Sequence, residues 1–165
     1  MSRIDRIAAL SLMLALAAPA LAQTRTPGPE YLTVFDDRIR MGARIVTSQD
    51  GAPAAEVATT DWLRLELGFI TSADVAHGKV RLRCDTSFAG PDGAGAQTVR
   101  SAPCWQGDLA EVAGKWVPMP DANLRFHPER TDPNGRWFVR VVVRDDVTGH
   151  TATLTPSYTW TGGTR

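Results

Sequence analysis

Apolar and polar residues alternate along three stretches in the first half of the chain. In segments 39–45, 63–69 and 80–84 every second residue is apolar: Ile39, Met41, Ala43, Ile45, Leu63, Leu65, Leu67, Phe69, Val80, Leu82 and Cys84. A period of two is typical of a β-strand with one face buried and the other in water. The pattern therefore predicts three strands, and it turns Cys84 toward the core.

The C-terminal part alternates in the same way, in two runs joined by a turn. Trp or Val occupies every second position from 137 to 143, and the next run sets Ala152, Leu154, Tyr158 and Trp160 against Thr and Ser residues. The Asp- and Gly-containing segment 145–149 between the runs predicts a β-hairpin. We expect Trp137 and Trp160 in the core. Because Pro156 has no N–H, the last strand should lie at a sheet edge or be bulged there.

Shorter strand candidates lie at 31–35, 115–117 and 123–126, and no segment after the N-terminus has a helical period. About seven short strands separated by turns predict an all-β, immunoglobulin-like antiparallel β-sandwich. A small closed barrel is the alternative. The run GRWFVRVVVRD at 135–145 resembles the penultimate strand and turn of many bacterial immunoglobulin-like domains. We expect a single domain over 31–162, after an extended lead-in at 23–30.

The N-terminus has the three parts of an export signal. Arg3 and Arg6 precede an apolar stretch at 7–18, and Ala20-Leu21-Ala22 supplies the small residues that a signal peptidase recognises. This order predicts a signal peptide over 1–22 and a periplasmic protein. A membrane anchor is the alternative, but the apolar stretch is shorter than the ~20 residues that a span needs. We therefore expect no membrane span after cleavage.

Charge disfavours nucleic acid as a partner. The whole chain has 18 basic and 18 acidic residues, and cleavage would remove Arg3, Arg6 and Asp5, leaving a net charge near −1. The basic residues are also spread along the sequence rather than clustered. A near-neutral domain of this kind has no electrostatic preference for polyanions.

Cys84 and Cys104 are the two cysteines of the chain. In an oxidising compartment such a pair most often forms a structural disulfide. The segment between them is rich in Gly and Pro, and we expect a loop with little order of its own. Closing a loop of this length is worth ~3 kcal/mol in the chain-entropy model. A redox pair or zinc site would need C-x-x-C or closely spaced ligands, which the sequence lacks.

Motifs for chemistry are missing from the sequence. It has no G-x-S-x-G, no Gly-rich phosphate loop, no dinucleotide fingerprint and no haem attachment signal, so we expect no enzyme activity and no cofactor. His77, His127 and His150 occupy turn-like sequence and are expected at the surface. A further hypothesis is that the three histidines converge on a metal ion and form the site of a metal-dependent enzyme. A Ca²⁺ site near Asp132 and Asn134 would lack the full loop motif.

Paired carboxylates occur at Asp36-Asp37 and at Asp145-Asp146. Adjacent residues of a strand point to opposite faces, so neither pair is placed to act as an acid–base couple. We interpret both pairs as turn residues.

Three tryptophans fall outside the core pattern. Trp62 shares the outward phase of Arg64 and Glu66, Trp105 follows a cysteine, and Trp116 lies in the proline-rich stretch 115–120. Large apolar side chains outside the pattern can mark a binding surface. Alternatively, Trp105 and Trp116 plug the open ends of the sandwich.

These observations favour a non-catalytic exported accessory or structural subunit. We expect it to bind another periplasmic or membrane-associated protein, for example as a small subunit of a periplasmic enzyme complex, through Trp62, Trp105, Trp116 and Met119. The alternative is a binding module for a carbohydrate or a small hydrophobic ligand that uses the same tryptophans.

Overall fold

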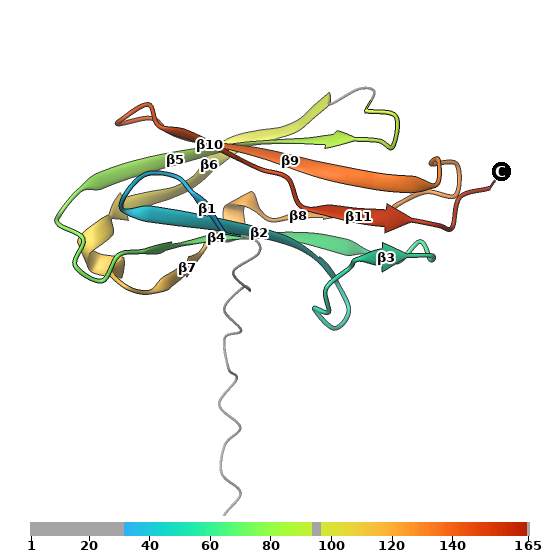
Figure 1. The fold of residues 1–165 in the computed structure, drawn as a ribbon, viewed down its shortest axis with the longest axis horizontal. Helices are drawn as coiled ribbons and strands as arrows, with labels where there is room; N and C mark the ends of the chain where they lie inside the picture. Colours follow the sequence, from blue (N-terminus) through green and yellow to red (C-terminus); the bar gives the residue numbers. More distant parts are fainter. Residues whose placement is uncertain (1–31, 94–96, 165) are drawn as a thin grey trace, which may run out of the picture.

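The computed structural model describes residues 32–93 and 97–164, which form two β-sheets packed face to face (Figure 1). The predicted immunoglobulin-like two-sheet sandwich is confirmed. The described residues contain eleven strands rather than about seven. The sequence pattern gave no sign of the long strand Gln97–Asp108 or of the short strand Glu56–Val57, and the last predicted strand is divided in two. The predicted signal peptide and lead-in lie outside the described residues.

The first sheet, here sheet A, has the strand order β1-β2-β4-β7, with β8 also paired to β4. Its strands are β1 (Leu32–Val34), β2 (Ile39–Thr47), β4 (Leu63–Thr71), β7 (Trp116–Pro118) and β8 (Leu124–Phe126). All of its pairings are antiparallel.

The second sheet, here sheet B, has the order β3-β11-β9-β5-β6, with β10 also paired to β9. Its strands are β3 (Glu56–Val57), β5 (Lys79–Ala89), β6 (Gln97–Asp108), β9 (Gly135–Asp145), β10 (Thr151–Leu154) and β11 (Ser157–Trp160). The short β3 pairs with β11 in parallel, and the other pairings are antiparallel. Two short 3₁₀ helices, Leu109–Val112 and Pro120–Ala122, connect β6 to β7 and β7 to β8.

The core fills the space between the sheets, and the predicted alternation is confirmed. The apolar positions of 39–45, 63–69 and 80–84 are all buried, as are Val139, Val141 and Val143. Trp160 is fully buried and Trp137 packs against the core from its edge. Burial of each large apolar side chain contributes about 1.5–3 kcal/mol. No helix in the described part of the chain is long and apolar enough to cross a membrane.

The segment between the two cysteines is a β-hairpin, which corrects the predicted loop. β5 continues to Ala89 and β6 begins at Gln97, so most of the segment belongs to a two-stranded ladder. The predicted disulfide is confirmed: Cys84 and Cys104 are bonded across the two strands, with their Cα atoms 5.8 Å apart. The proline content favoured a loop, but Pro103 lies at a bulge, where a strand tolerates proline.

That bulge also decides where Trp105 points. The ladder pairs Leu82 with Trp105 but Arg83 with Pro103, so Cys104 is an extra residue on β6. The two neighbours Cys104 and Trp105 therefore both face the core, although regular alternation would place them on opposite sides.

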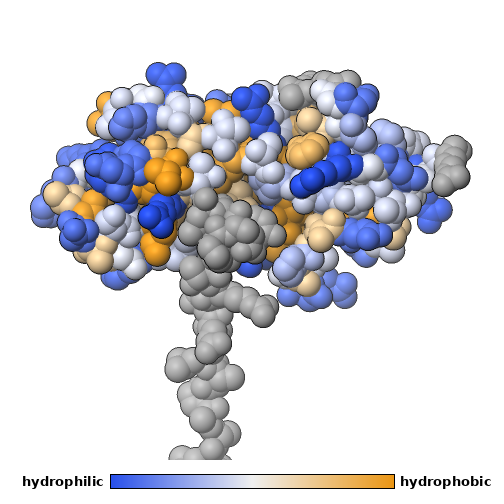
Figure 2. Space-filling view, in the orientation of Figure 1, coloured by the Kyte–Doolittle hydropathy of each residue, from blue (hydrophilic) through white to orange (hydrophobic). Residues whose placement is uncertain are grey.

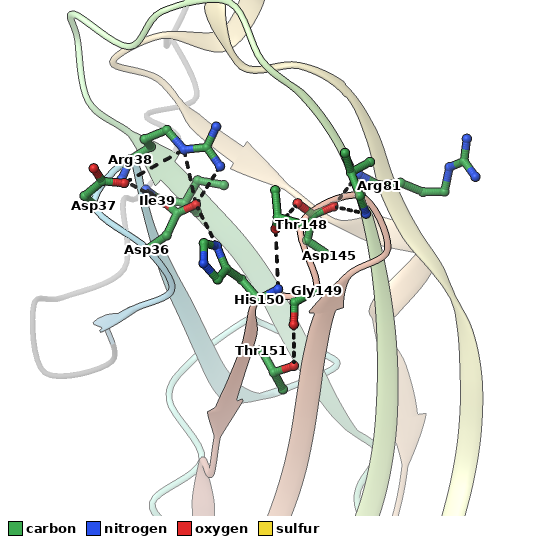
Figure 3. A network of polar contacts seen from close by, with 11 residues as sticks. Asp36, Asp37, Arg38, Ile39, Arg81, Asp145, Thr148, Gly149, His150 and Thr151 are labelled. Atoms are coloured by element: carbon green, nitrogen blue, oxygen red, sulfur yellow. Dashed lines mark hydrogen bonds and ion pairs between the residues drawn. The ribbon is translucent and has the colours of Figure 1, made fainter.

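The predicted C-terminal hairpin is confirmed, and Asp145 holds its turn. Its Oδ1 accepts hydrogen bonds from the backbone N–H groups of Arg81 and Val147 at 3.0 Å, and its Oδ2 accepts one from Thr148 Oγ1 at 2.7 Å (Figure 3). Burial raises the pKa of Asp145, but these hydrogen bonds outweigh it and lower the pKa below its usual value. The last strand is interrupted at Pro156, which separates β10 from β11.

Asp36 has the same role in the turn between β1 and β2. It accepts hydrogen bonds from the backbone N–H groups of Arg38 and Ile39 at 2.8 and 2.9 Å, and it pairs with the Arg38 guanidinium at 2.7 Å (Figure 3). Burial raises the pKa of Asp36, and the bonds from Arg38 more than offset this, so that the pKa is lowered. The interpretation of both acidic pairs as turn residues is confirmed.

Candidate binding surface

Trp62 and Trp116 lie on the outer face of sheet A. On β4 the odd-numbered residues from Leu63 to Phe69 are buried in the core, so the even-numbered ones face outward. Trp116 pairs with Ile70 of this outward set. Trp62 immediately precedes β4, and 46% of its surface is exposed, which agrees with its predicted outward phase.

Trp62 is the centre of a small aromatic and cationic cluster. The Arg125 guanidinium carbon lies 4.7 Å from the Trp62 ring centroid, and the His127 ring meets the Trp62 ring edge-on at 4.5 Å. The register that pairs Arg125 with Arg64 brings β8 alongside Trp62. A cation over an indole ring contributes about 0.5–1 kcal/mol at an exposed site. We call Trp62, Arg125 and His127 the Trp62 cluster.

A depression of about 520 Å³ adjoins the Trp62 cluster. Its lining consists of Thr47, Ser48, Gln49, Asp50, Asp61, Trp62 and Arg125. The Ser48 Oγ atom is buried and has no hydrogen-bond partner among the described residues. A hydroxyl of this kind leaves a donor and an acceptor for a bound polar group.

The two carboxylates of the depression are held by local hydrogen bonds. Asp50 accepts one from Thr47 Oγ1 and one from the backbone N–H of Ala52, and these two bonds lower the pKa of Asp50. Asp61 accepts one from Thr59 Oγ1. The depression therefore combines an apolar aromatic ring with several oriented oxygen atoms, a mixture that suits a polar ligand or a polar protein segment.

Trp116 is more enclosed than Trp62. Its ring packs closely against Gly68, where a Cβ atom would come within 2.3 Å of the indole. Glycine at position 68 is therefore the residue that lets the ring pack onto the sheet. This packing leaves Trp116 half-buried rather than projecting from the surface.

An ion-pair strip separates the two tryptophans on this face. Glu66 binds Arg44 at 2.6 Å and Arg64 at 2.5 Å, each through one of its two oxygens. Burial raises the pKa of Glu66, but the two guanidinium groups outweigh it, so that the pKa is lowered. The strip keeps Trp62 and Trp116 from forming one continuous aromatic surface.

Trp105 and Met119 do not lie with Trp62 and Trp116 on the outer face of sheet A, and their part in binding stays a prediction. Trp105 packs edge-on against Phe69 at a centroid distance of 4.9 Å and closes the core at the β6 edge. Gly107, two residues later on the same side, makes room for its ring. Met119 is fully buried. For Trp105 the alternative interpretation, an aromatic plug at the end of the sandwich, fits the structure.

The three histidines lie in different connecting segments. His77 lies 3.3 Å from Asp108, His150 lies 3.6 Å from Asp36, and His127 contacts Trp62. In the part of the chain that the structure describes, no group of three or more His, Cys, Asp or Glu side chains is arranged to hold a metal ion. Asp132 and Asn134 accept backbone hydrogen bonds from Glu129 and Gly163.

Sequence analysis missed Arg125, Ser48, Asp50 and Asp61 as neighbours of Trp62. The position of Arg125 in the predicted short strand 123–126 was the one sequence signal that could have indicated an outward-facing side chain. The other three lie in loops before β3 and before β4, and their approach to Trp62 depends on the pairing of β2 with β4. A loop's position relative to a strand is not encoded in periodicity.

The chain is thus an antiparallel β-sandwich domain of immunoglobulin-like type with an exposed aromatic and arginine cluster on one face. No protein-family model matches the chain, and no curated protein matches it. Similar solved structures include a family 123 glycoside hydrolase from Clostridium perfringens, at 12% identity and a TM-score of 0.41, over 73% of this chain and 27% of that one.

Two further solved structures are similar. The DNA glycosylase AlkC from Pseudomonas fluorescens matches at 16% identity and a TM-score of 0.34, over 69% of this chain and 30% of that one. A CARDB domain from Pyrococcus furiosus matches at 10% identity and a TM-score of 0.38, over 82% of this chain and 100% of that one. The likeness is one of fold, and it transfers no function to this chain.

Proposed function

We propose that the protein is a non-catalytic, exported accessory or structural subunit that binds another periplasmic or membrane-associated protein. The observation that carries the proposal is the Trp62 cluster, where an exposed indole, a guanidinium group and an imidazole meet beside a depression. Trp and Arg are the residues most enriched among the energetic hot spots of protein interfaces. Export is supported by the signal-like N-terminus and by the disulfide, which persists in oxidising compartments.

Co-purification tests the proposal. The full chain, recovered from native periplasm and membranes, is expected to elute in a stoichiometric complex that mass spectrometry identifies. Trp62→Ala should weaken that complex by at least about tenfold, because a hot-spot truncation costs about 2 kcal/mol or more. Val99→Ala, which removes another exposed apolar side chain on β6, is the matched control and should leave the complex intact.

The result that overturns the proposal is recovery of the wild-type protein as a free monomer under these conditions. Export is tested separately by fractionation and N-terminal sequencing. We expect a mature protein that begins at Gln23, and a cytoplasmic protein with an intact N-terminus would contradict the periplasmic assignment.

The second candidate function is carbohydrate or small-ligand binding at the depression beside Trp62. It is favoured by the Ser48 hydroxyl that lacks a partner and by Asp50 and Asp61 in the same lining. Titration with a panel of neutral oligosaccharides should change the tryptophan fluorescence of the wild type and leave that of Trp62→Ala unchanged. No response of the wild type to any member of the panel would contradict this function.

A further inference from the structure

The outer face of sheet B gathers basic residues that are scattered in the sequence. In β5 the residues at 80, 82 and 84 are buried, and in β9 so are those at 139, 141 and 143, so the residues between them face outward. The outward positions include Lys79, Arg81, Arg83, Arg136, Arg140 and Arg144, which we call the basic face. β5 and β9 are neighbours in the sheet, and the six side chains therefore share one surface.

The register brings several of these cations close together. Arg83 pairs directly with Arg144, and Ser87 pairs with Arg140. Outward residues recur about every 7 Å along a strand, so the three cations of β5 form a closely spaced row. Like charges placed directly opposite each other on a sheet destabilise the fold. A bound anion would relieve that repulsion.

Most of these charges have no counter-ion in the described residues. Arg83 lies 3.6 Å from Asp146, and Arg136 donates a hydrogen bond to Ser157. Within the described ranges 32–93 and 97–164, no carboxylate lies within ion-pair distance of Arg81, Arg140 or Arg144, all of which are exposed. Two carboxylates border the basic face: Asp85 lies on β5 itself, and Asp108 at the end of β6 pairs with Lys79.

Apolar surface is interspersed with the charges. Phe138 and Val142 face outward between the arginines of β9 and are half-buried, and the Arg136 guanidinium carbon lies 5.3 Å from the Phe138 ring centroid. At one end the basic face borders a depression of about 530 Å³, whose lining includes Lys79, Arg81 and the exposed Val147 together with the carboxylates Asp108 and Glu111. A purely anionic polymer would leave this apolar surface uncovered.

We propose that the basic face binds an acidic, extended segment of a partner protein in which carboxylates alternate with apolar side chains. Five of the six cations are arginines, whose planar guanidinium groups bind carboxylates through two parallel hydrogen bonds. Sheets twist, so a planar lipid bilayer would touch only part of this face, whereas an extended segment can follow it. The basic face lies on the opposite side of the sandwich from the Trp62 cluster, as the two layers in Figure 1 show. The two surfaces are therefore independent.

Calorimetric titration of the full chain tests the proposal with two probes. The first is poly-L-glutamate, and the second is a peptide of equal charge in which Glu alternates with Val. We expect both to bind, the alternating peptide several-fold more tightly, and both to weaken as salt is raised. Equal affinity for the two probes would overturn the apolar part of the proposal, and no binding of either would overturn all of it.

Charge-reversal variants locate the binding. Combining Arg81→Glu, Arg140→Glu and Arg144→Glu should reduce the affinity for the alternating peptide at least about tenfold. The matched control combines Arg40→Glu, Lys115→Glu and Arg130→Glu, which changes the net charge equally at exposed positions elsewhere, and it should stay within about twofold of the wild type. Equal losses in the two triple variants would mean unspecific charge attraction and contradict the proposal.

Two more arms separate the remaining outcomes. If the first triple variant does not fold, the amide chemical shifts of the wild type are measured with and without the peptide instead. We expect the shifts of β5 and β9 to change on binding. Changes confined to other strands would overturn the proposal. Tighter binding to phosphatidylglycerol vesicles than to the peptide would assign the face to a membrane instead. Trp62→Ala should bind the peptide normally, so failure of the proposed function and failure of this inference are distinguishable.

Discussion

The two outer faces of the sandwich hold their arginines in opposite ways. On sheet A, Arg44 and Arg64 both bind Glu66, and Arg125 stacks on Trp62. On the basic face of sheet B, Arg140 and Arg144 are exposed, without an ion pair in the described part of the chain. Sheet A thus holds Arg44, Arg64 and Arg125 in contacts on its own surface, whereas sheet B presents Arg140 and Arg144 to solvent. Figure 2 shows hydrophilic residues over both outer layers, with apolar surface along the seam between them.

The position of the carboxylates explains this difference. Glu66 lies in the middle of β4, directly opposite Arg44 on β2, so an ion pair forms across the ladder. On β9 the carboxylate of Asp145 points inward, and its oxygens bind backbone N–H groups and a threonine hydroxyl instead. A one-residue difference in strand phase thus decides whether an acidic residue neutralises the surface or organises the turn.

The largest expected effect concerns the disulfide, a covalent link between two strands of sheet B. Replacing Cys84 and Cys104 together by Ala should lower the free energy of unfolding by roughly 3 kcal/mol, because the disulfide closes a loop of about 20 residues. Urea unfolding of the variant and of the reduced wild type should give the same midpoint. The reductant should not affect the variant, and a wild-type midpoint that reduction leaves unchanged would contradict the stabilising role.

The next effect concerns the buried acid of sheet B. Asp145→Ala should lower the free energy of unfolding by roughly 2 kcal/mol, because the N–H groups of Arg81 and Val147 lose their acceptor. Asp145→Asn keeps one acceptor oxygen and should lose less. Chemical unfolding at neutral pH measures both, and equal stability of Asp145→Ala and the wild type would show that the turn does not depend on this carboxylate.

The same carboxylate has a pH signature. Its folded-state pKa lies below the unfolded value of 3.8, so the stability that it adds is present above that pH and is lost as the pH falls through the folded-state value. The difference in unfolding free energy between the wild type and Asp145→Asn should therefore shrink below about pH 4. A difference that stays constant from pH 7 down to pH 2 would be inconsistent with the lowered pKa.

Periodicity predicted the sheets well because it follows directly from which side chains leave water. In 63–69 and 139–143 every second residue is apolar, and the structure buries each of these residues. Periodicity could not predict the direction of Trp105, because the bulge at Cys104 shifts the phase of β6 by one residue and turns the Trp105 side chain inward. A bulge arises from pairing with another strand, which a single strand's pattern does not contain.

The surfaces were harder to predict than the core. The outward phase of Trp62 was readable from its neighbours, but Arg125 reaches it only through the pairing of β8 with β4. The basic residues are separated along the sequence, and the ladder between β5 and β9 makes them one face. Charge clustering is a property of strand order, so counting charges along the chain overlooks it.

The smallest expected effects compare one charge from each outer face. Glu66→Gln should lower the free energy of unfolding by about 1 kcal/mol, because it leaves Arg44 and Arg64 facing each other without their shared counter-ion. Arg144→Gln removes an exposed, unpaired cation opposite Arg83, and its effect should stay within about 0.5 kcal/mol. Urea unfolding at low and high salt measures both. The loss in Glu66→Gln should shrink at high salt, since screening weakens exposed ion pairs. If Arg144→Gln were instead the more damaging change, the arginines of sheet B would be structural, and their availability to a partner would lose its basis.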